Sequence, residues 1–240
     1  TEKRKIMNRY DVVCFGAHPD DIEFGMGGTV LKLVDSGKKV LMVIFTRGEK
    51  GTYGTPIQRE KEFQSAAEKI GCGYKIFDWI DCEFTESYEN KLEIARLIRE
   101  AKPAICFAPY HTHFHDHHNG AAHPDHLRCG RMVNEALRFA RFRSIMPDKE
   151  AHDVHKIFFY MLPREVKPSF VIDVSDVQER LVEVIRCHES QMSIHRGDKN
   201  VLSLLTHARE VTGLYSQTQF SEAFLCEEML KTDVNNLFQF

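Results

Sequence analysis

Short, uninterrupted apolar segments recur along this chain, and helical segments lie between most of them. The predicted strands cover residues 11–15, 40–45, 74–77, 104–108, 156–160 and 169–174. The predicted helices cover residues 25–36, 55–70, 90–101, 125–142 and 177–188. Continuous rather than alternating apolar strands, separated by helices, predict a mostly parallel sheet covered on both faces. We therefore expect an α/β three-layer sandwich, with residues 1–240 forming a single domain.

The composition argues against several classes of protein. A formal net charge of −3 gives no overall basic surface for nucleic acid or an anionic membrane. No apolar run reaches the roughly 20 residues of a membrane helix, and residues 1–9 lack the apolar core of a signal peptide. The seven cysteines form no C-x-x-C pair. We expect a cytoplasmic protein whose cysteines are reduced, lie within strands and helices, and take no part in catalysis.

The first chemically distinctive segment is GAHPDD at residues 16–21, directly after the first predicted strand. Imidazole and carboxylate groups are ligands for zinc and similar divalent ions. His18 and Asp21 lie three positions apart in a tight turn, so that both side chains can bind one ion. Asp20 lies between them and is expected to point toward the water that the ion activates. The segment therefore predicts part of a metal site at the carboxyl end of a strand, where sites form in parallel sheets.

A second segment, HPDH at residues 123–126, follows the fourth predicted strand and begins a helix. Asp125 suits a helix start, because a carboxylate there can cap the helix and interacts well with its dipole. His126 can supply a third metal ligand. Three protein ligands leave one coordination position open, which is typical of catalytic rather than structural zinc. Either segment alone would be typical of an ordinary turn, but two of them after strands of one sheet indicate a metal site.

Together, the segments AHPDDIE and HPDH resemble the PIG-L-like (LmbE-like) family of zinc-dependent N-acetylglucosaminyl deacetylases. Residues 46–62, 167–175 and 189–191 resemble the same family, so the similarity covers most of the chain. Within the family the chain looks most like the bacillithiol-biosynthesis branch, which acts on N-acetylglucosaminyl malate. The resemblance implies a Rossmann-like sandwich, one Zn²⁺ or another divalent ion such as Fe²⁺, and a homo-oligomer, often a hexamer.

The resemblance also implies roles for particular residues. The implied zinc ligands are His18, Asp21 and His126. Asp20 is implied as the general base, and Arg59 as a substrate contact. His123 and Asp125 are implied as an acid or oxyanion-stabilising pair, in which we expect Asp125 to hold the His123 ring in its working tautomer. In this mechanism Asp20 takes a proton as water attacks the acetyl carbonyl, and His123 or protonated Asp20 protonates the leaving amine.

Other functions stay open on the sequence alone. A phosphoesterase would need a basic clamp, to which Arg47 and Arg59 could contribute, and often a second metal, for which no second carboxylate set is evident. A non-enzymatic metal- or sugar-binding protein would leave Asp20 and His123 without a purpose. Residues 25–28 (GMGG) lack both the dinucleotide and the Walker spacing, which argues against a nucleotide-binding domain. We expect these glycines to allow close helix packing instead. Among deacetylase substrates, N-acetylglucosamine and chitooligosaccharides are the alternatives.

Histidine is unusually concentrated in one part of the chain. Seven of the 13 histidines lie between His111 and His126. We expect the stretch from His111 to His118 to be a solvated surface loop. The alternative is a rim or lid of the pocket with its own metal affinity, which would reshape the part of the site that contacts the aglycone.

Overall fold

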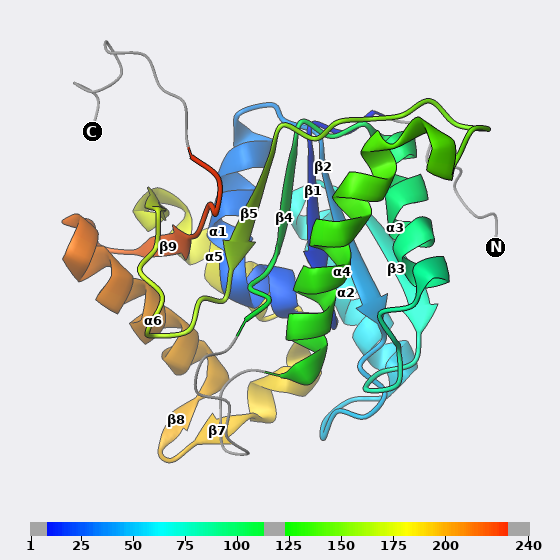
Figure 1. Cartoon of the computed structure of the whole chain (residues 1–240). Helices are drawn as coiled ribbons and strands as arrows, with labels where there is room; N and C mark the ends of the chain where they lie inside the picture. The colour runs from blue at the N-terminus through cyan, green and yellow to red at the C-terminus, as the bar shows by residue number, and fades with distance from the viewer. Residues whose placement is uncertain (1–8, 113–122, 230–240) are drawn as a thin grey trace, which may run out of the picture.

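The computed structural model describes residues 9–112 and 123–229. Its centre is a five-stranded, fully parallel sheet in the order β3-β2-β1-β4-β5, shown in Figure 1. The strands are β1 (Val12–Gly16), β2 (Val40–Thr46), β3 (Gly73–Trp79), β4 (Ile105–Pro109) and β5 (Lys156–Tyr160). The chain runs outward from β1 to β2 and β3, and then returns to β4 on the other side of β1. The strand order therefore reverses between β1 and β4, where open α/β sheets bind their ligands.

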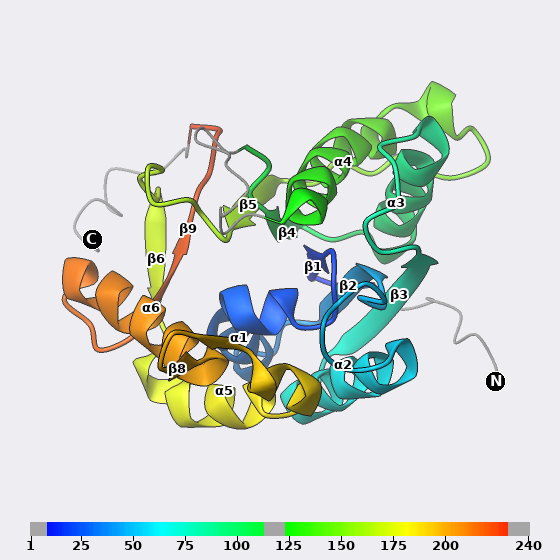
Figure 2. The ribbon, with the colours of Figure 1, turned by 90° about the horizontal axis from the view of Figure 1, so that it is seen from below.

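Helices cover both faces of this sheet, as Figure 2 shows. The helices on one face are α3 (Tyr88–Ala101) and α4 (Pro124–Arg141). Those on the other face are α1 (Asp21–Asp35), α2 (Pro56–Ile70) and α5 (Gln178–Ile185). Val13 and Phe15 of β1 pack into the core under α3 and α4, whereas Val12 and Cys14 pack into the core under α1, α2 and α5. Because both faces of β1 are buried, its apolar run has no polar alternation. The predicted α/β three-layer fold is confirmed.

One predicted strand joins a different sheet. Residues 169–174 contain β6 (Phe170–Asp173), which pairs antiparallel with β9 (Ser221–Phe224) in a two-stranded sheet. The segment between β5 and β6 is too short for the crossover of a dozen or more residues that a parallel partner of β5 would need. The predicted strand is therefore present, but it lies outside the parallel sheet.

Beyond residue 188 the amino-acid pattern predicts no clear element, and the structure contains short elements there. The strands are β7 (His195–Arg196) and β8 (Lys199–Asn200), and the long helix is α6 (Val201–Ser216). The 3-10 helices of the described chain are η1 (Arg143–Ile145), η2 (Ser175–Val177) and η3 (Glu189–Ser193). Across the described ranges, no helix is both long enough and apolar enough to cross a lipid bilayer.

Helix α1 begins at Asp21, earlier than the glycine-rich segment suggested, and it is kinked at Met26, whose φ of −151° is not helical. The glycines around the kink lie against bulky side chains. A Cβ on Gly25 would lie 2.6 Å from Cε2 of Tyr160, and one on Gly28 would lie 2.8 Å from Cβ of Val174. Real Cβ atoms do not approach this closely, so the expected role of residues 25–28 in close packing is confirmed.

Candidate active site

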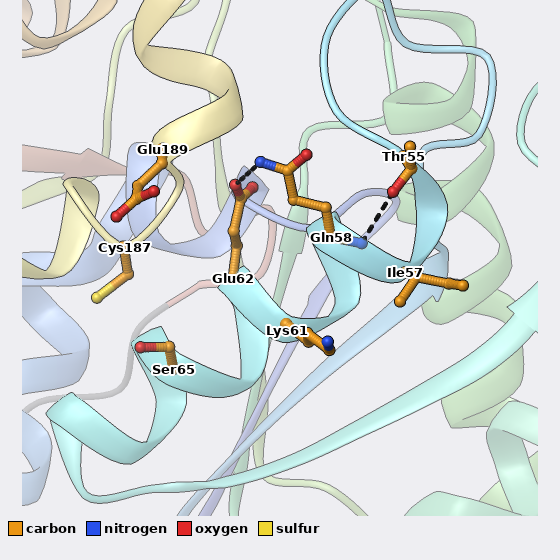
Figure 3. Close-up of a pocket in the computed structure, with 8 residues that line it drawn as sticks. All are labelled: Thr55, Ile57, Gln58, Lys61, Glu62, Ser65, Cys187 and Glu189. Atoms are coloured by element: carbon orange, nitrogen blue, oxygen red, sulfur yellow. Dashed lines mark hydrogen bonds between the residues drawn. The ribbon is translucent and has the colours of Figure 1, made fainter.

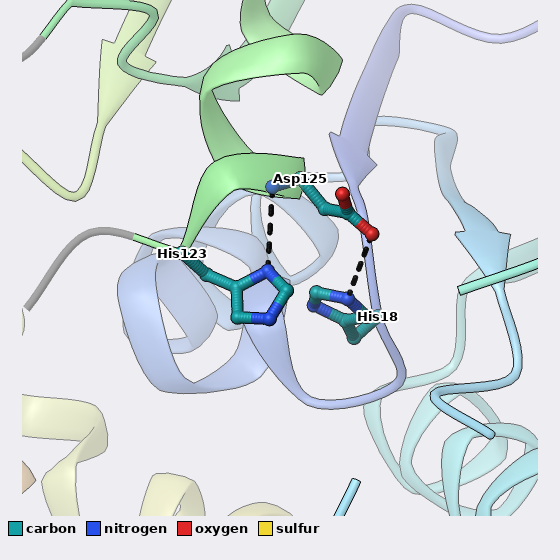
Figure 4. A group of neighbouring side chains, drawn as sticks. All are labelled: His18, His123 and Asp125. Carbon is teal, nitrogen blue, oxygen red and sulfur yellow. Dashed lines mark hydrogen bonds and ion pairs between the residues drawn. The ribbon is translucent and has the colours of Figure 1, made fainter. Parts of the chain in front are cut away.

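The loops after β1 and β4 meet at the carboxyl edge of the sheet, because these two strands are neighbours. The loop after β1 carries His18 and Asp20, and Asp21 begins α1. His123 is the N-cap residue of α4, and Asp125 lies in its first turn. Figure 4 shows the His123 ring and the Asp125 carboxylate beside the His18 ring. The fold therefore brings together all seven predicted site residues. Six lie on these two loops and the helix starts that follow them, and Arg59 of α2 reaches Asp20 with its Nη2 at 3.3 Å.

Asp21 lies between two imidazole rings. Its Oδ1 lies 2.9 Å from Nε2 of His126, and its Oδ2 lies 3.6 Å from Nδ1 of His18. Donor atoms of these three residues lie within 4.8 Å of one another. Two imidazoles and one carboxylate suit zinc or a similar divalent ion, so the three residues form a candidate metal site.

Backbone donors fix the Asp21 carboxylate in this position. Its Oδ2 accepts hydrogen bonds from the backbone N of Ala17 at 2.7 Å and of His18 at 2.9 Å. Burial alone would raise the pKa of Asp21, but the charge and hydrogen bond of His126, with those of His18, hold this pKa well below its usual value. Asp21 is therefore a carboxylate at neutral pH, which is the form that binds a cation.

The other nitrogen of His18 faces two further carboxylates. Nε2 lies 3.0 Å from Oδ1 of Asp81 and 3.6 Å from Oδ2 of Asp125. Burial alone would lower the pKa of His18, but hydrogen bonds with Asp125, Asp21 and Asp81 raise it well above its usual value. A carboxylate that accepts the Nε2 proton leaves Nδ1 free to bind a metal, as in carboxylate–histidine–metal arrangements.

Asp81 is a site residue that the sequence reasoning missed. It is buried in the turn after β3, and its Oδ2 accepts a hydrogen bond from the backbone N of Lys50 at 3.0 Å. The available signal was its place directly after a strand of the same parallel sheet, at the edge where the two metal-ligand segments lie. The weak apolar pattern of residues 74–77 predicted a strand shorter than the observed β3 and drew no attention to its end.

Asp20 has an unusual backbone. As the N-cap residue of α1 it has a φ of 116°, which is strained for any residue but glycine, and such strain is concentrated at functional sites. Burial raises the pKa of Asp20 to about 6, although the positive charge of Arg59 opposes this shift. An aspartate with this pKa is suited to accept a proton near neutral pH.

Arg59 holds the loop around Asp20 from α2. Its Nη2 donates to the carbonyl oxygen of Pro19 at 2.9 Å and lies 3.3 Å from Oδ2 of Asp20. Its Nη1 donates to the carbonyl oxygen of Gly48 at 3.0 Å, and only 5% of the residue is exposed. Both terminal nitrogens are thus bonded within the protein, and the substrate contact implied for Arg59 stays a prediction.

The tautomer of His123 is set by a backbone amide. Its Nδ1 accepts a hydrogen bond from the backbone N of Asp125 at 3.3 Å, so the neutral ring carries its proton on Nε2. The Asp125 carboxylate instead accepts from the backbone N of Cys82 at 2.8 Å and from Arg128 at 2.6 Å. Burial lowers the pKa of His123, as do the charges of His18 and His126, which keeps the ring neutral. In the described structure the backbone of Asp125, rather than its side chain, therefore orients this ring, because an N-cap side chain bonds to the amide groups that begin its helix.

Cys82 lies at the edge of this cluster and corrects another expectation. It lies in a turn rather than in a strand or helix, is exposed, and has a φ of 62°. Its Sγ lies 4.0 Å from Nε2 of His123 and 3.4 Å from Oδ1 of Asp81. Burial and the neighbouring Asp81 charge raise the pKa of the Cys82 thiol, so it is protonated and a weak nucleophile at neutral pH.

Two further groups of potential metal-binding residues share Asp125. One is His18, His123 and Asp125, and the other is Asp81, Cys82 and Asp125, which the sequence did not indicate. The arginines expected for a phosphate clamp are bonded elsewhere. Arg47 pairs with Glu60 at 2.6 Å and with Asp78, and the terminal nitrogens of Arg59 are engaged as described above. The described residues therefore contain second-site carboxylates but no free pair of arginines for a phosphate, which argues against a phosphoesterase.

Two further features lie outside this cluster of site residues. A cavity of about 470 Å³, shown in Figure 3, lies between α2 and the segment after α5, and none of the predicted site residues lines it. Of the histidine-rich stretch, His111 is described, and its Nε2 lies 3.1 Å from Glu227. Residues 113–122 lie outside the described residues, so the expectations for the stretch from His111 to His118 stay predictions.

The fold and the site together define an α/β protein with a candidate metal site at the switch point of a parallel sheet. Residues 13–137, just over half of the chain, match the PIG-L family, described as GlcNAc-PI de-N-acetylase. The chain belongs to this family and is an N-acetyl sugar deacetylase. The resemblance to this family that the sequence indicated is therefore confirmed.

Individual relatives support this class without fixing one substrate. A diacetylchitobiose deacetylase of Thermococcus kodakarensis is 31% identical over 193 residues, which are 75% of this chain and 69% of the relative. A probable N-acetyl-α-D-glucosaminyl L-malate deacetylase 2 of Bacillus anthracis is 25% identical over 201 residues, 78% and 83% of the two chains. The conserved protein TT1542 of Thermus thermophilus superposes with a TM-score of 0.82 at 26% identity, covering 94% and 98%.

Proposed function

We propose that this chain is a metal-dependent hydrolase that removes the acetyl group from an N-acetylglucosamine-containing substrate. The observation that carries the proposal is the Asp21 carboxylate between His18 and His126, with Asp20 beside it in a strained loop. We propose His18, Asp21 and His126 as the ligands of one divalent ion, with zinc as the first candidate and Fe²⁺ as the second. The donor set fits, since it combines two imidazoles with a carboxylate that is ionised at neutral pH. When bound, such an ion polarises a carbonyl group and lowers the pKa of water.

Asp20 and His123 divide the proton chemistry in this proposal. Asp20, with a pKa of about 6, accepts a proton from the attacking water and then delivers it to the leaving amine. The neutral His123 ring donates its Nε2 hydrogen to the oxyanion that develops on the acetyl carbonyl. Asp125 contributes through its backbone amide, which keeps the His123 proton on Nε2.

For the substrate, we propose a neutral N-acetylglucosaminide such as diacetylchitobiose. A malate aglycone carries two carboxylates, and these need cationic partners. The described cations near the site are already paired: Arg59 with backbone oxygens and Asp20, Arg128 with Asp125, and Lys50 with Glu83 at 2.9 Å. N-acetylglucosaminyl malate, as in bacillithiol biosynthesis, is the second candidate, and similarity to the Bacillus anthracis relative favours it.

A substrate panel tests this proposal. Acetate release is measured from diacetylchitobiose, N-acetylglucosamine and N-acetylglucosaminyl malate, with the metal content determined on the same samples. We expect hydrolysis that chelation abolishes and zinc restores, with the highest kcat/KM on the disaccharide. Full activity of metal-free protein would contradict the metal assignment. A higher kcat/KM on the malate glycoside would retain the chemistry and replace the substrate.

We also propose a homo-oligomer, as the family resemblance implies, in the cytoplasm. Helix α6 supports the first part, because Val211, Leu214 and Tyr215 are exposed on it. Light scattering on the purified chain tests the oligomer, and a monomer at micromolar concentration would contradict it.

A further inference from the structure

The kink in α1 interrupts the hydrogen bonds of the helix close to the metal site. In a regular helix the backbone N of Gly28 would donate to the carbonyl oxygen of Phe24. Met26 between them has a non-helical φ of −151°. The backbone N atoms of Gly28 and Thr29 donate instead to Oε1 and Oε2 of Glu222, at 3.0 and 2.7 Å. A carboxylate from β9 thus accepts from the amides on the C-terminal side of the kink.

An arginine donates hydrogen bonds to the carbonyl groups on the N-terminal side of the kink. Nη2 of Arg209 donates to the carbonyl oxygen of Phe24 at 2.8 Å and to that of Glu23 at 3.4 Å. Nε of the same arginine donates to Oε1 of Glu222 at 2.9 Å. The ion pair therefore replaces the missing helical hydrogen bond. It connects the Phe24 carbonyl, through Arg209 and Glu222, to the Gly28 amide. Side chains inserted in this way are a recognised cause of helix kinks.

The pair is buried and lies outside the metal-binding cluster. Arg209 on α6 is 4% exposed and Glu222 on β9 is 3% exposed. Figure 2 shows α6 and β9 beside α1. A buried ion pair is stable only when its charges are well matched and hydrogen-bonded, as both are here. The two side chains cannot exchange places, since the Glu222 carboxylate accepts from amide N–H groups and the Arg209 guanidinium donates to carbonyl groups.

The kink separates the first turn of α1 from the rest of the helix. That turn begins with Asp21, the residue between the two histidines, and is preceded by Asp20. An unsupported kink would let the turn pivot, and the Asp21 carboxylate would move relative to His18 and His126. Shifts of less than about 1 Å at a metal ligand weaken both binding and catalysis.

We propose that Arg209 and Glu222 are positioning residues, which fix the angle of the α1 kink and thereby hold Asp20 and Asp21 in the geometry that binds the metal. The inference rests on the proposed function, since it concerns the same metal site. It assigns to α6 and β9 a part in the active site although neither element supplies a residue to it.

The test compares Arg209→Lys and Glu222→Gln with the wild-type protein. Zinc affinity is measured by competition with a chromophoric chelator, and kcat and KM are measured on the zinc-loaded enzyme, both well below the unfolding temperature. We expect zinc affinity to fall roughly tenfold or more, as for other residues that orient metal ligands, and kcat to fall with little change in KM. Zinc affinity and kcat within twofold of the wild type, with only Tm lowered, would overturn the proposal.

Arg99→Lys is the matched control. Arg99 is 3% exposed and donates to carbonyl oxygens that include Ala140 and Met146, away from the site. We expect this variant to lose stability and to keep the zinc affinity of the wild type. An equal loss of affinity in Arg99→Lys would show that any buried arginine has the effect, and would also overturn the proposal.

A charge-swapped variant tests whether the pair acts through its hydrogen bonds to the α1 backbone or only through the attraction of its two charges. Combining Arg209→Glu with Glu222→Arg restores the opposite charges but places a carboxylate against carbonyls and a guanidinium against amides. We expect no rescue of zinc affinity, and rescue would contradict the directional role. If the swap does not fold, the single variants decide. Wild-type protein that binds neither zinc nor Fe²⁺ would instead refute the proposed metal site itself.

Discussion

Nε2 of His18, in the loop after β1, lies 3.0 Å from Oδ1 of Asp81, in the turn after β3. Strand β2 separates these two strands in the sheet, yet the parallel arrangement brings their carboxyl ends to the same edge. The contact leaves Nδ1 of His18 directed to Asp21. A carboxylate on the far side of a ligand ring fixes the ring and increases its basicity.

Replacement of Asp81 should therefore weaken metal binding. We expect Asp81→Asn to lower zinc affinity roughly tenfold or more, because an amide supports the His18 imidazole less well than a carboxylate. Isothermal titration with zinc measures the change. Asp78→Asn is the control, since this aspartate precedes Asp81 closely but is exposed and paired with Arg47. Equal affinities of Asp81→Asn and wild type would remove Asp81 from the metal site.

Asp20→Asn should abolish turnover and stabilise the metal-free protein. The folded-state pKa of about 6 lies above the usual aspartate value of about 4, so between these values the folded state holds a proton that the unfolded state has released. The Asp20 contribution to stability therefore falls as the pH rises from about 4 to about 6, and stays low above that. We expect Asp20→Asn to gain about 1–3 kcal/mol at pH 8 and less at pH 5.

Urea unfolding of chelator-treated protein at the two pH values measures this gain. Asparagine tolerates positive φ better than most residues, so the backbone of the loop should be kept. A variant that is less stable than the wild type at pH 8 would show that burial does not destabilise the Asp20 carboxylate.

Alkylation of Cys82 should block the site without any catalytic role for the thiol. Its Sγ lies 4.0 Å from Nε2 of His123, so an added N-ethylmaleimide group would occupy the space beside the proposed oxyanion donor. We expect Cys82→Ser to keep turnover within about threefold, as for a side chain outside the proton chemistry, and to be insensitive to the reagent. The wild type should be inactivated faster at pH 8.5 than at pH 7, because the raised pKa leaves the Cys82 thiol protonated at pH 7 and the reactive thiolate forms only as the pH rises. Inactivation of Cys82→Ser at the wild-type rate would assign the effect to another cysteine.

Gly25→Ala tests the close-packing role of the glycine-rich segment. The added Cβ would lie 2.6 Å from Cε2 of Tyr160, whose ring is fully buried and bonded through its hydroxyl to the carbonyl oxygen of Phe15 at 2.7 Å. Because this ring is held in place, we expect the free energy of unfolding to fall by about 1–3 kcal/mol. Urea denaturation measures it, and an unchanged midpoint would show that α1 can shift away from the ring.

The sequence by itself determined the sheet and two of the loops that form the site. Continuous apolar strands buried on both faces require helices on both sides, and parallel strands bring their carboxyl ends to one edge. These two rules are enough to place His18 and Asp21 near His126. The local spacing also located the beginning of α4, because a histidine–proline–aspartate sequence suits a helix N-terminus.

Only the tertiary structure decided which groups surround these residues. Asp81 and Cys82 reach the site through the length of β3 and the turn after it, and the tautomer of His123 follows from its N-cap geometry. Arg209 and Glu222 meet the α1 kink because α6 and β9 pack beside it. Periodicity in a sequence reports which face of an element is buried, since it reflects local geometry. It does not report which distant side chain completes a hydrogen bond, since that depends on how whole elements pack.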